Sequence, residues 1–107
     1  MATTEMNCLA SGGGLKSFYK EYTNPGGPIT ESIDFEPTVV IYCRCNNNSR
    51  TFVIRVDMDN STTNADFWYD GTYQSVSISS VYEYSNGSIT LKDLNANDTT
   101  VYVFAQE

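Results

Sequence analysis

Apolar and polar side chains alternate from Ile29 to the C-terminus, which is the pattern of β-strands that bury one face and expose the other. Residues 51–58 show this pattern most clearly, and their expected inward side chains are Phe52, Ile54, Val56 and Met58. In residues 38–45 we expect Val39, Ile41, Cys43 and Cys45 to point inward, leaving Val40, Tyr42 and Arg44 on the other face. The Asn-rich residues 46–49 between the two segments favour a turn, so we predict a hairpin.

Two further turn signals divide the second half of the chain. Asn86-Gly87 separates two short apolar runs, and this dipeptide is the strongest two-residue hairpin signal because a type I′ turn needs positive φ at both positions. Asp70-Gly71 predicts a turn before a Ser-rich strand, 72–79, in which Val76 and Ile78 point inward. A β-branched and aromatic strand, 100–105, ends the chain. The pattern predicts an all-β protein, an antiparallel β-sandwich of six to eight short strands.

Residues 1–28 differ from the rest in composition. Gly12-Gly13-Gly14 and Pro25-Gly26-Gly27-Pro28 bracket a short amphipathic piece, Leu15 to Tyr22. We therefore expect a flexible Gly/Pro-rich lead with one possible strand over residues 1–28, and the sandwich over residues 29–107. A chain of 107 residues suits one domain.

The charge balance excludes several classes of partner. Thirteen acidic side chains against six basic ones give a net charge of -7, which repels phosphate backbones and anionic lipid surfaces. We expect no nucleic-acid partner. The longest apolar stretches, Val39 to Tyr42 and Val101 to Ala105, fall far short of the ~18 residues that span a bilayer, so we expect no membrane insertion.

The absence of histidine limits the chemistry. Neither a Ser-His-Asp nor a Cys-His arrangement can be assembled, so we predict that the protein is not an enzyme and carries no metal site and no cofactor. The interpretation of Cys8, Cys43 and Cys45 that we favour is three reduced thiols, although the sequence leaves their redox state open.

One aromatic stretch is the best candidate for binding. Residues 66–73 mix aromatic rings, which stack on the C–H faces of sugars, with carboxylates, which accept hydroxyl hydrogen bonds. The candidate glycan-binding residues are Asp66, Trp68, Tyr69, Asp70 and Tyr73. The alternative is that Trp68 packs in the core or in a subunit interface.

Two resemblances refine the fold. In the segment Ile33 to Val40 an aromatic residue, Phe35, precedes Pro37 and a β-rich strand, and residues 29–107 resemble H-type lectin-like domains and small bacteriophage tail proteins. This resemblance implies a sandwich that often trimerises and presents loops to sugars or bacterial surfaces; Phe104 stands near the family's usual Trp. More weakly, Ser88 to Phe104 is similar to part of an immunoglobulin-like variable-type domain, with Phe104 in place of the expected cysteine.

These observations predict a non-enzymatic virion structural or tail-associated module, made in the host cytoplasm and located in the virion. We expect a homo-oligomer, with a trimer favoured, that contacts other virion proteins and binds bacterial surface glycan through the Trp68 segment. The alternative is an immunoglobulin-like adhesion or receptor-binding domain. A third hypothesis is an acidic inhibitor or DNA mimic.

Overall fold

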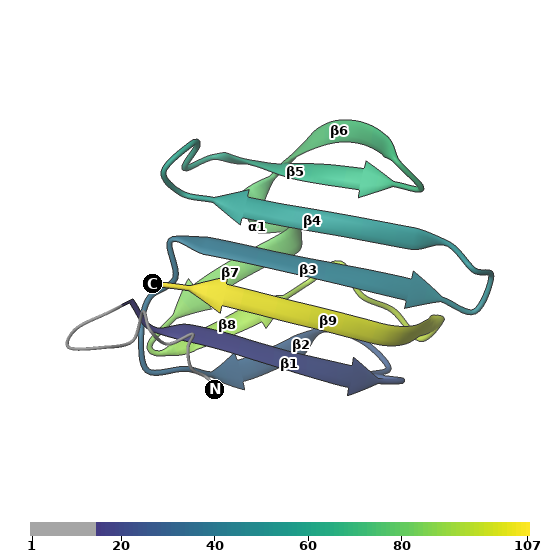
Figure 1. Ribbon diagram of the computed structural model, residues 1–107, viewed down its shortest axis with the longest axis horizontal. Coiled ribbons are helices and arrows are strands. Elements are labelled where there is room, and N and C mark those ends of the chain that lie inside the picture. Colours follow the sequence, from purple (N-terminus) through teal and green to yellow (C-terminus); the bar gives the residue numbers. More distant parts are fainter. Residues whose placement is uncertain (1–14) are drawn as a thin grey trace.

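The protein is a sandwich of two antiparallel sheets, seen in the computed structural model, which describes residues 15–107 (Figure 1). The larger sheet has six strands in the order β1-β9-β3-β4-β5-β6 and the smaller has three in the order β2-β8-β7. Their bounds are β1 Ser17–Thr23, β2 Ile29–Ser32, β3 Val39–Asn46, β4 Thr51–Asp57, β5 Asn64–Tyr69, β6 Thr72–Ser77, β7 Tyr82–Ser85, β8 Ser88–Leu91 and β9 Asp98–Gln106. The predicted all-β sandwich is confirmed. The expected lead up to residue 14, with Cys8, lies outside the described residues.

The predicted hairpins are present. β3 pairs with β4, and β7 with β8, both antiparallel. Asp70 and Gly71 join β5 to β6 with φ of 46° and 88°, and Asn86 and Gly87 join β7 to β8 with φ of 50° and 80°. These positive values are those of a type I′ turn, which the sequence predicted for Asn86-Gly87; for Asp70-Gly71 it predicted a turn without specifying the type. β1 adds a ninth strand, which lies at one edge of the larger sheet beside β9.

A short helix, α1 (Ile78–Val81), interrupts the β pattern where the chain leaves the larger sheet for the smaller one. The sequence had indicated no helix, and it had placed Ile78 within a strand. The one-turn helix follows β6 directly, and the hydroxyl of Ser80 within it donates to the carbonyl of Ser77 at 2.7 Å. Ile78 nevertheless packs against the core, as does Val76.

The core lies between the two sheets. Its fully enclosed side chains come from both layers: Val40, Tyr42, Ile54, Val56, Ile89, Leu91, Val101 and Val103. The prediction for β4 is confirmed for Phe52, Ile54 and Val56, which are all buried. Met58 is 36% exposed in the turn that follows β4, so its predicted inward orientation is wrong.

The predicted orientation of β3 is reversed in the structure. Val40, Tyr42 and Arg44 point into the core, whereas Val39, Ile41, Cys43 and Cys45 lie half-buried on the outer face. The strand carries apolar residues on both faces, so hydrophobicity alone did not decide its orientation, and the charge of Arg44 favoured the wrong choice. Arg44 is 5% exposed because acidic partners neutralise it inside the sandwich.

The part of the chain that the structure describes contains no helix long and apolar enough to cross a membrane.

Candidate ligand-binding face

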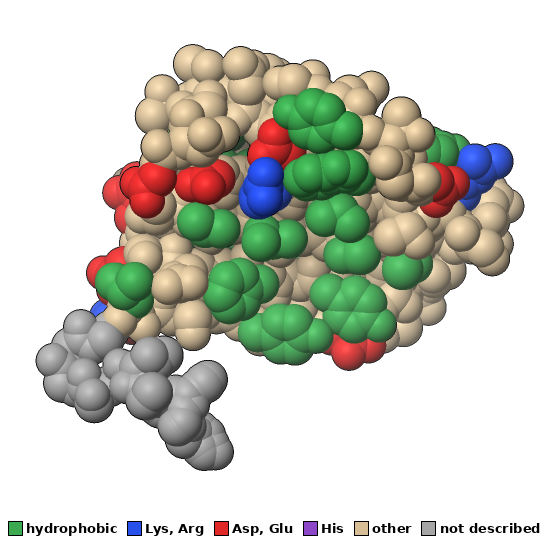
Figure 2. Space-filling model, turned by 45° about the horizontal axis from the view of Figure 1, so that its top comes forward, with side chains coloured by type: hydrophobic (Ala, Val, Ile, Leu, Met, Phe, Trp, Pro, Cys, Tyr) green, Lys and Arg blue, Asp and Glu red, His purple; other side chains and the backbone are tan. Residues whose placement is uncertain are grey.

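The outer face of the larger sheet carries exposed tyrosines and half-buried aliphatic and aromatic side chains. Residues paired across neighbouring antiparallel strands share a face, so the register brings distant residues into rows. One row runs Glu21, Tyr102, Cys43, Val53, Trp68 and Tyr73, and the next runs Tyr19, Phe104, Ile41, Arg55, Asp66 and Ser75. Figure 2 shows hydrophobic side chains gathered over this face. Large exposed apolar patches of this kind mark interaction surfaces.

Trp68 is held between two neighbours on this face. The ring of Tyr73 from β6 lies 5.5 Å from the indole, tilted by 57°, and the guanidinium carbon of Arg55 from β4 lies 5.2 Å from the indole centre. Trp68 is half-buried and does not belong to the core, which excludes one alternative for its role. The flanking groups fix the ring while one part of it stays open to solvent.

Asp66 connects these two neighbours. Its Oδ2 accepts from Nε and Nη2 of Arg55 at 3.0 and 2.9 Å, and its Oδ1 accepts from the Tyr73 hydroxyl at 2.8 Å. These hydrogen bonds, from Tyr73 first and then Arg55, hold the pKa of the Asp66 carboxyl below its usual value. The same bond raises the pKa of the Tyr73 hydroxyl. Asp66 therefore stays ionised at neutral pH and orders the residues around the indole.

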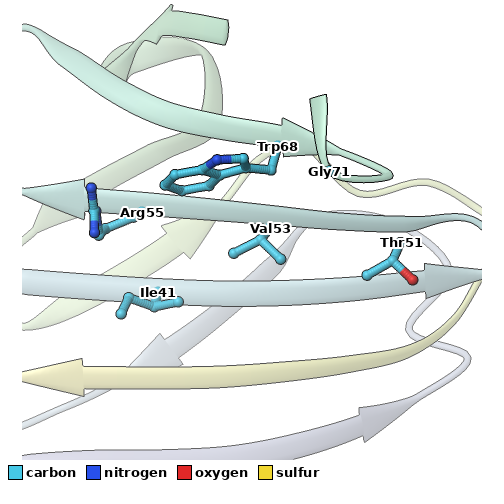
Figure 3. Close-up of a pocket in the computed structure, with 6 residues that line it drawn as sticks. All are labelled: Ile41, Thr51, Val53, Arg55, Trp68 and Gly71. Carbon is cyan, nitrogen blue, oxygen red and sulfur yellow. The ribbon is translucent and has the colours of Figure 1, made fainter. Parts of the chain in front are cut away.

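A pocket of about 460 Å³ opens beside Trp68 (Figure 3). It is lined by Ile41, Thr51, Val53, Arg55, Trp68 and Gly71. The close-up shows the indole above Val53 and Ile41, with Arg55 toward one end and Thr51 and Gly71 toward the other. The pocket thus combines an aromatic wall and an aliphatic floor with polar groups at its ends. Small-molecule sites have the same organisation, a mostly apolar lining with a few placed polar groups.

The structure separates the five candidate residues into two groups. Asp66, Trp68 and Tyr73 lie together on the outer face. Tyr69 points to the inner side, where its ring meets that of Phe52 edge-on at 4.7 Å.

The carboxylate of Asp70, in the β5–β6 turn, makes hydrogen bonds within the protein. Its Oδ1 accepts from the backbone N–H of Thr51 at 2.9 Å, and its Oδ2 lies 3.4 Å from Arg50. Asp70 positions the turn at one end of the pocket.

Sequence reasoning missed Arg55, Val53, Ile41 and Thr51 as parts of this site. Alternation along residues 51–58 does place Arg55 on the face opposite Ile54, so a signal for its outward orientation existed. The pairing of β4 with β5 puts Arg55 opposite Asp66. The local sequence pattern did not predict the register of this pairing.

Two chemical properties limit what the face can bind. All six Lys and Arg side chains of the chain are engaged in ion pairs, including Arg55 with Asp66. Within residues 15–107 no group of three or more His, Cys, Asp or Glu side chains is placed to hold a metal ion. Cys43 and Cys45, half-buried on the same face, are free thiols.

Comparison with protein-family models, curated proteins and solved structures gives no match to this chain.

Proposed function

We propose that this protein is a non-enzymatic carbohydrate-binding module and that its binding site is the pocket beside Trp68. The observation that carries the proposal is that Trp68 and Arg55 line the pocket while Tyr73 and Asp66 hold these two side chains in place. An indole face offers a stacking surface for the C–H side of a sugar ring, while the Arg55 guanidinium and the Thr51 hydroxyl, which also line the pocket, are the polar groups for sugar hydroxyls.

The electrostatics favour a neutral sugar over an acidic one. Arg55 is the cation that lines the pocket, and its charge is already neutralised by Asp66 at 2.9 Å. The chain as a whole carries a net charge of -7 and repels anions. A sugar carboxylate or sulfate would gain little electrostatic attraction at this site. Hexoses and their uncharged oligomers are therefore the ligand class that we propose.

A glycan array followed by calorimetry with the best neutral glycan tests the proposal. Trp68→Ala removes the stacking surface and should weaken binding roughly tenfold or more, corresponding to ~1.4 kcal/mol. Tyr19→Ala is the matched control, because Tyr19 is a 63% exposed aromatic residue of the same face that lies on β1, away from the pocket. Equal affinities of Trp68→Ala and the unmodified protein would reject the site.

The narrower proposal is that the module is a virion structural or tail-associated protein, made in the host cytoplasm, that assembles as a homo-oligomer with other virion proteins. The resemblance of residues 29–107 to H-type lectin-like and bacteriophage tail domains supports this setting. Mass spectrometry of purified particles from the producing host is the direct test. Absence of the chain from intact particles would favour the immunoglobulin-like adhesion alternative.

The third hypothesis, an acidic inhibitor or DNA mimic, has less support. It requires free carboxylates gathered on one face, whereas seven carboxylates distributed over both sheets are paired with Lys or Arg. Competition with DNA for a DNA-binding enzyme would be its test.

A further inference from the structure

The two edge strands of the larger sheet differ in how well they are protected against pairing with a strand of another chain. β1 forms one edge and carries Lys20 and Glu21 in its middle, and charged residues on an edge strand discourage pairing with another chain. β6 (Thr72–Ser77) forms the other edge and has the sequence TYQSVS, with no charge and no proline (Figure 1). An unprotected edge of this kind is a template for a further strand.

The register of the β5–β6 hairpin shows which backbone groups of β6 are open. Tyr69 and Thr72 flank the turn and exchange hydrogen bonds, and such pairs alternate along an antiparallel ladder. Tyr73, Ser75 and Ser77 consequently direct their backbone N–H and C=O groups away from β5. The carbonyl of Ser77 accepts from Ser80 at 2.7 Å, while the outward groups of Tyr73 and Ser75 have no hydrogen-bond partner among residues 15–107.

We propose that this edge binds a second copy of the same chain, with β6 antiparallel to β6 about a two-fold axis at Gln74. In this register Tyr73 lies opposite Ser75 of the second copy, and Ser75 opposite its Tyr73. Each pair exchanges two backbone hydrogen bonds, so the edge gains about four in total. The contact is isologous, because the same strand contributes on both sides, and it closes after two copies.

The charge distribution supports a second copy as the occupant. Two chains of net charge -7 repel each other over most of their surfaces. β6 is uncharged, and the nearest acid on the outer face, Asp66, is neutralised by Arg55. This edge is therefore a place where two identical acidic molecules approach without facing like charges.

The pairing has a consequence for ligand binding, which rests on the proposed function. Residues opposite each other in a ladder share a face, so the two six-stranded sheets would join with their outer faces on the same side. Both Trp68 pockets would then point in one direction. Two weak sites on one face bind a repetitive glycan surface with increased avidity.

Sedimentation velocity across a concentration series tests the pairing. The unmodified protein should shift from monomer to dimer mass as concentration rises. Ser75→Pro removes the outward N–H of Ser75 and leaves the ladder to β5 intact, so it should raise the dissociation constant at least tenfold. Ser75→Ala keeps the N–H and is the matched control, which should dimerise like the unmodified protein.

A second variant covers the case in which Ser75→Pro does not fold, as judged by circular dichroism. Ser75→Lys retains the backbone donor and places like charges on both sides of the dyad, so it should also raise the dissociation constant. A monomer at all concentrations, a dimer that neither variant weakens, or a trimer insensitive to both would overturn the pairing.

Two measurements separate this proposal from the glycan proposal. Trp68→Ala should weaken sugar binding roughly tenfold or more and leave the dimer unchanged. Ser75→Pro should leave the affinity for a soluble monovalent sugar unchanged and lower retention on an immobilised glycan surface. Dimerisation without sugar binding would overturn only the glycan site, and sugar binding by a strict monomer only the pairing.

Discussion

Arg44 and Asp98 form an ion pair inside the sandwich, with Nη1 of the guanidinium 2.8 Å from Oδ1 of the carboxylate. The Asp98 side chain is completely buried, and the Arg44 side chain is 7% exposed. Oδ2 of Asp98 also accepts from the backbone N–H of Asn95 at 2.7 Å, and the guanidinium lies 3.8 Å from the ring centre of Phe52. The pair thus ties β3 and the start of β9 to the loop that follows β8.

Removing one charge of this pair should be strongly destabilising. Asp98→Asn leaves the Arg44 charge without its closest partner in a buried site, and we expect a loss of about 3 kcal/mol or more in the free energy of unfolding in urea. Asp93→Asn is the control, since Asp93 contacts the same guanidinium at 3.1 Å but its side chain is 36% exposed. Its loss should stay below about 1 kcal/mol. Equal losses in the two variants would contradict this account.

The stability of the β5–β6 turn should depend on Gly71 because of its backbone conformation and not because of a steric clash. Gly71 has φ of +88°, and a Cβ added there meets no atom within 4 Å, so Gly71→Ala adds backbone strain without a clash. We expect a loss of roughly 1–2 kcal/mol in thermal or urea unfolding. Gly27→Ala, also in open space but without a positive φ, should be neutral or slightly stabilising. A neutral Gly71→Ala would show that the turn relaxes at no cost.

Stability should fall at high pH because the fold keeps buried tyrosines neutral. Burial is the main reason that the pKa of Tyr82 is raised to about 12, with Glu36 adding to it. An unfolded tyrosine ionises near pH ~10. The stabilisation is complete below pH ~10 and is lost as pH rises from there toward the folded pKa, by up to ~1.4 kcal/mol per pH unit for this residue.

Urea midpoints at pH 9, 10 and 11.5 check this sign. Tyr82→Phe should show a shallower decline, because one buried ionisable group is gone. The change should cost little at neutral pH, since the Tyr82 hydroxyl is buried with no hydrogen-bond partner among residues 15–107. Parallel declines in the two proteins would remove Tyr82 from the explanation.

Trp68 is the single tryptophan of the chain, so its fluorescence reports on the proposed site alone. Tyr73 and Arg55 lower the pKa of Asp66, and the arrangement that they stabilise is complete above the ordinary carboxyl pKa of 3.8 and is lost as pH falls through the depressed value. We expect a fluorescence transition below pH 3.8 with far-ultraviolet dichroism unchanged. Asp66→Asn should lack the transition, and its persistence in that variant would assign it to another group.

Local patterns predicted the elements that local chemistry determines. The Asn86-Gly87 and Asp70-Gly71 turns and the inward face of β4 follow from residues adjacent in sequence. The orientation of β3 did not, because it depends on Asp98, which lies 54 residues from Arg44. No period-two pattern identifies a carboxylate that neutralises a distant charge.

The sequence likewise predicted only those parts of the candidate site that depend on residue type and on local turns. Trp68 and Tyr73 were recognised by residue type, and the two-residue turn fixes them opposite each other. The orientation of Tyr69 follows from alternation, since it must face opposite to Trp68. Arg55 and Val53 belong to the site because β4 pairs with β5, and the polar loop between these strands left the register of that pairing undetermined by the sequence pattern.

The unequal widths of the two sheets have a consequence for which positions tolerate substitution. The β5–β6 hairpin is attached to the six-stranded sheet through β4 alone, whereas the most enclosed side chains lie on β3, β4, β8 and β9. Substitutions at the exposed positions of that hairpin should therefore alter the proposed binding site with little penalty to folding. The core strands stay unaltered when the residues that the hairpin contributes to the proposed binding site are exchanged.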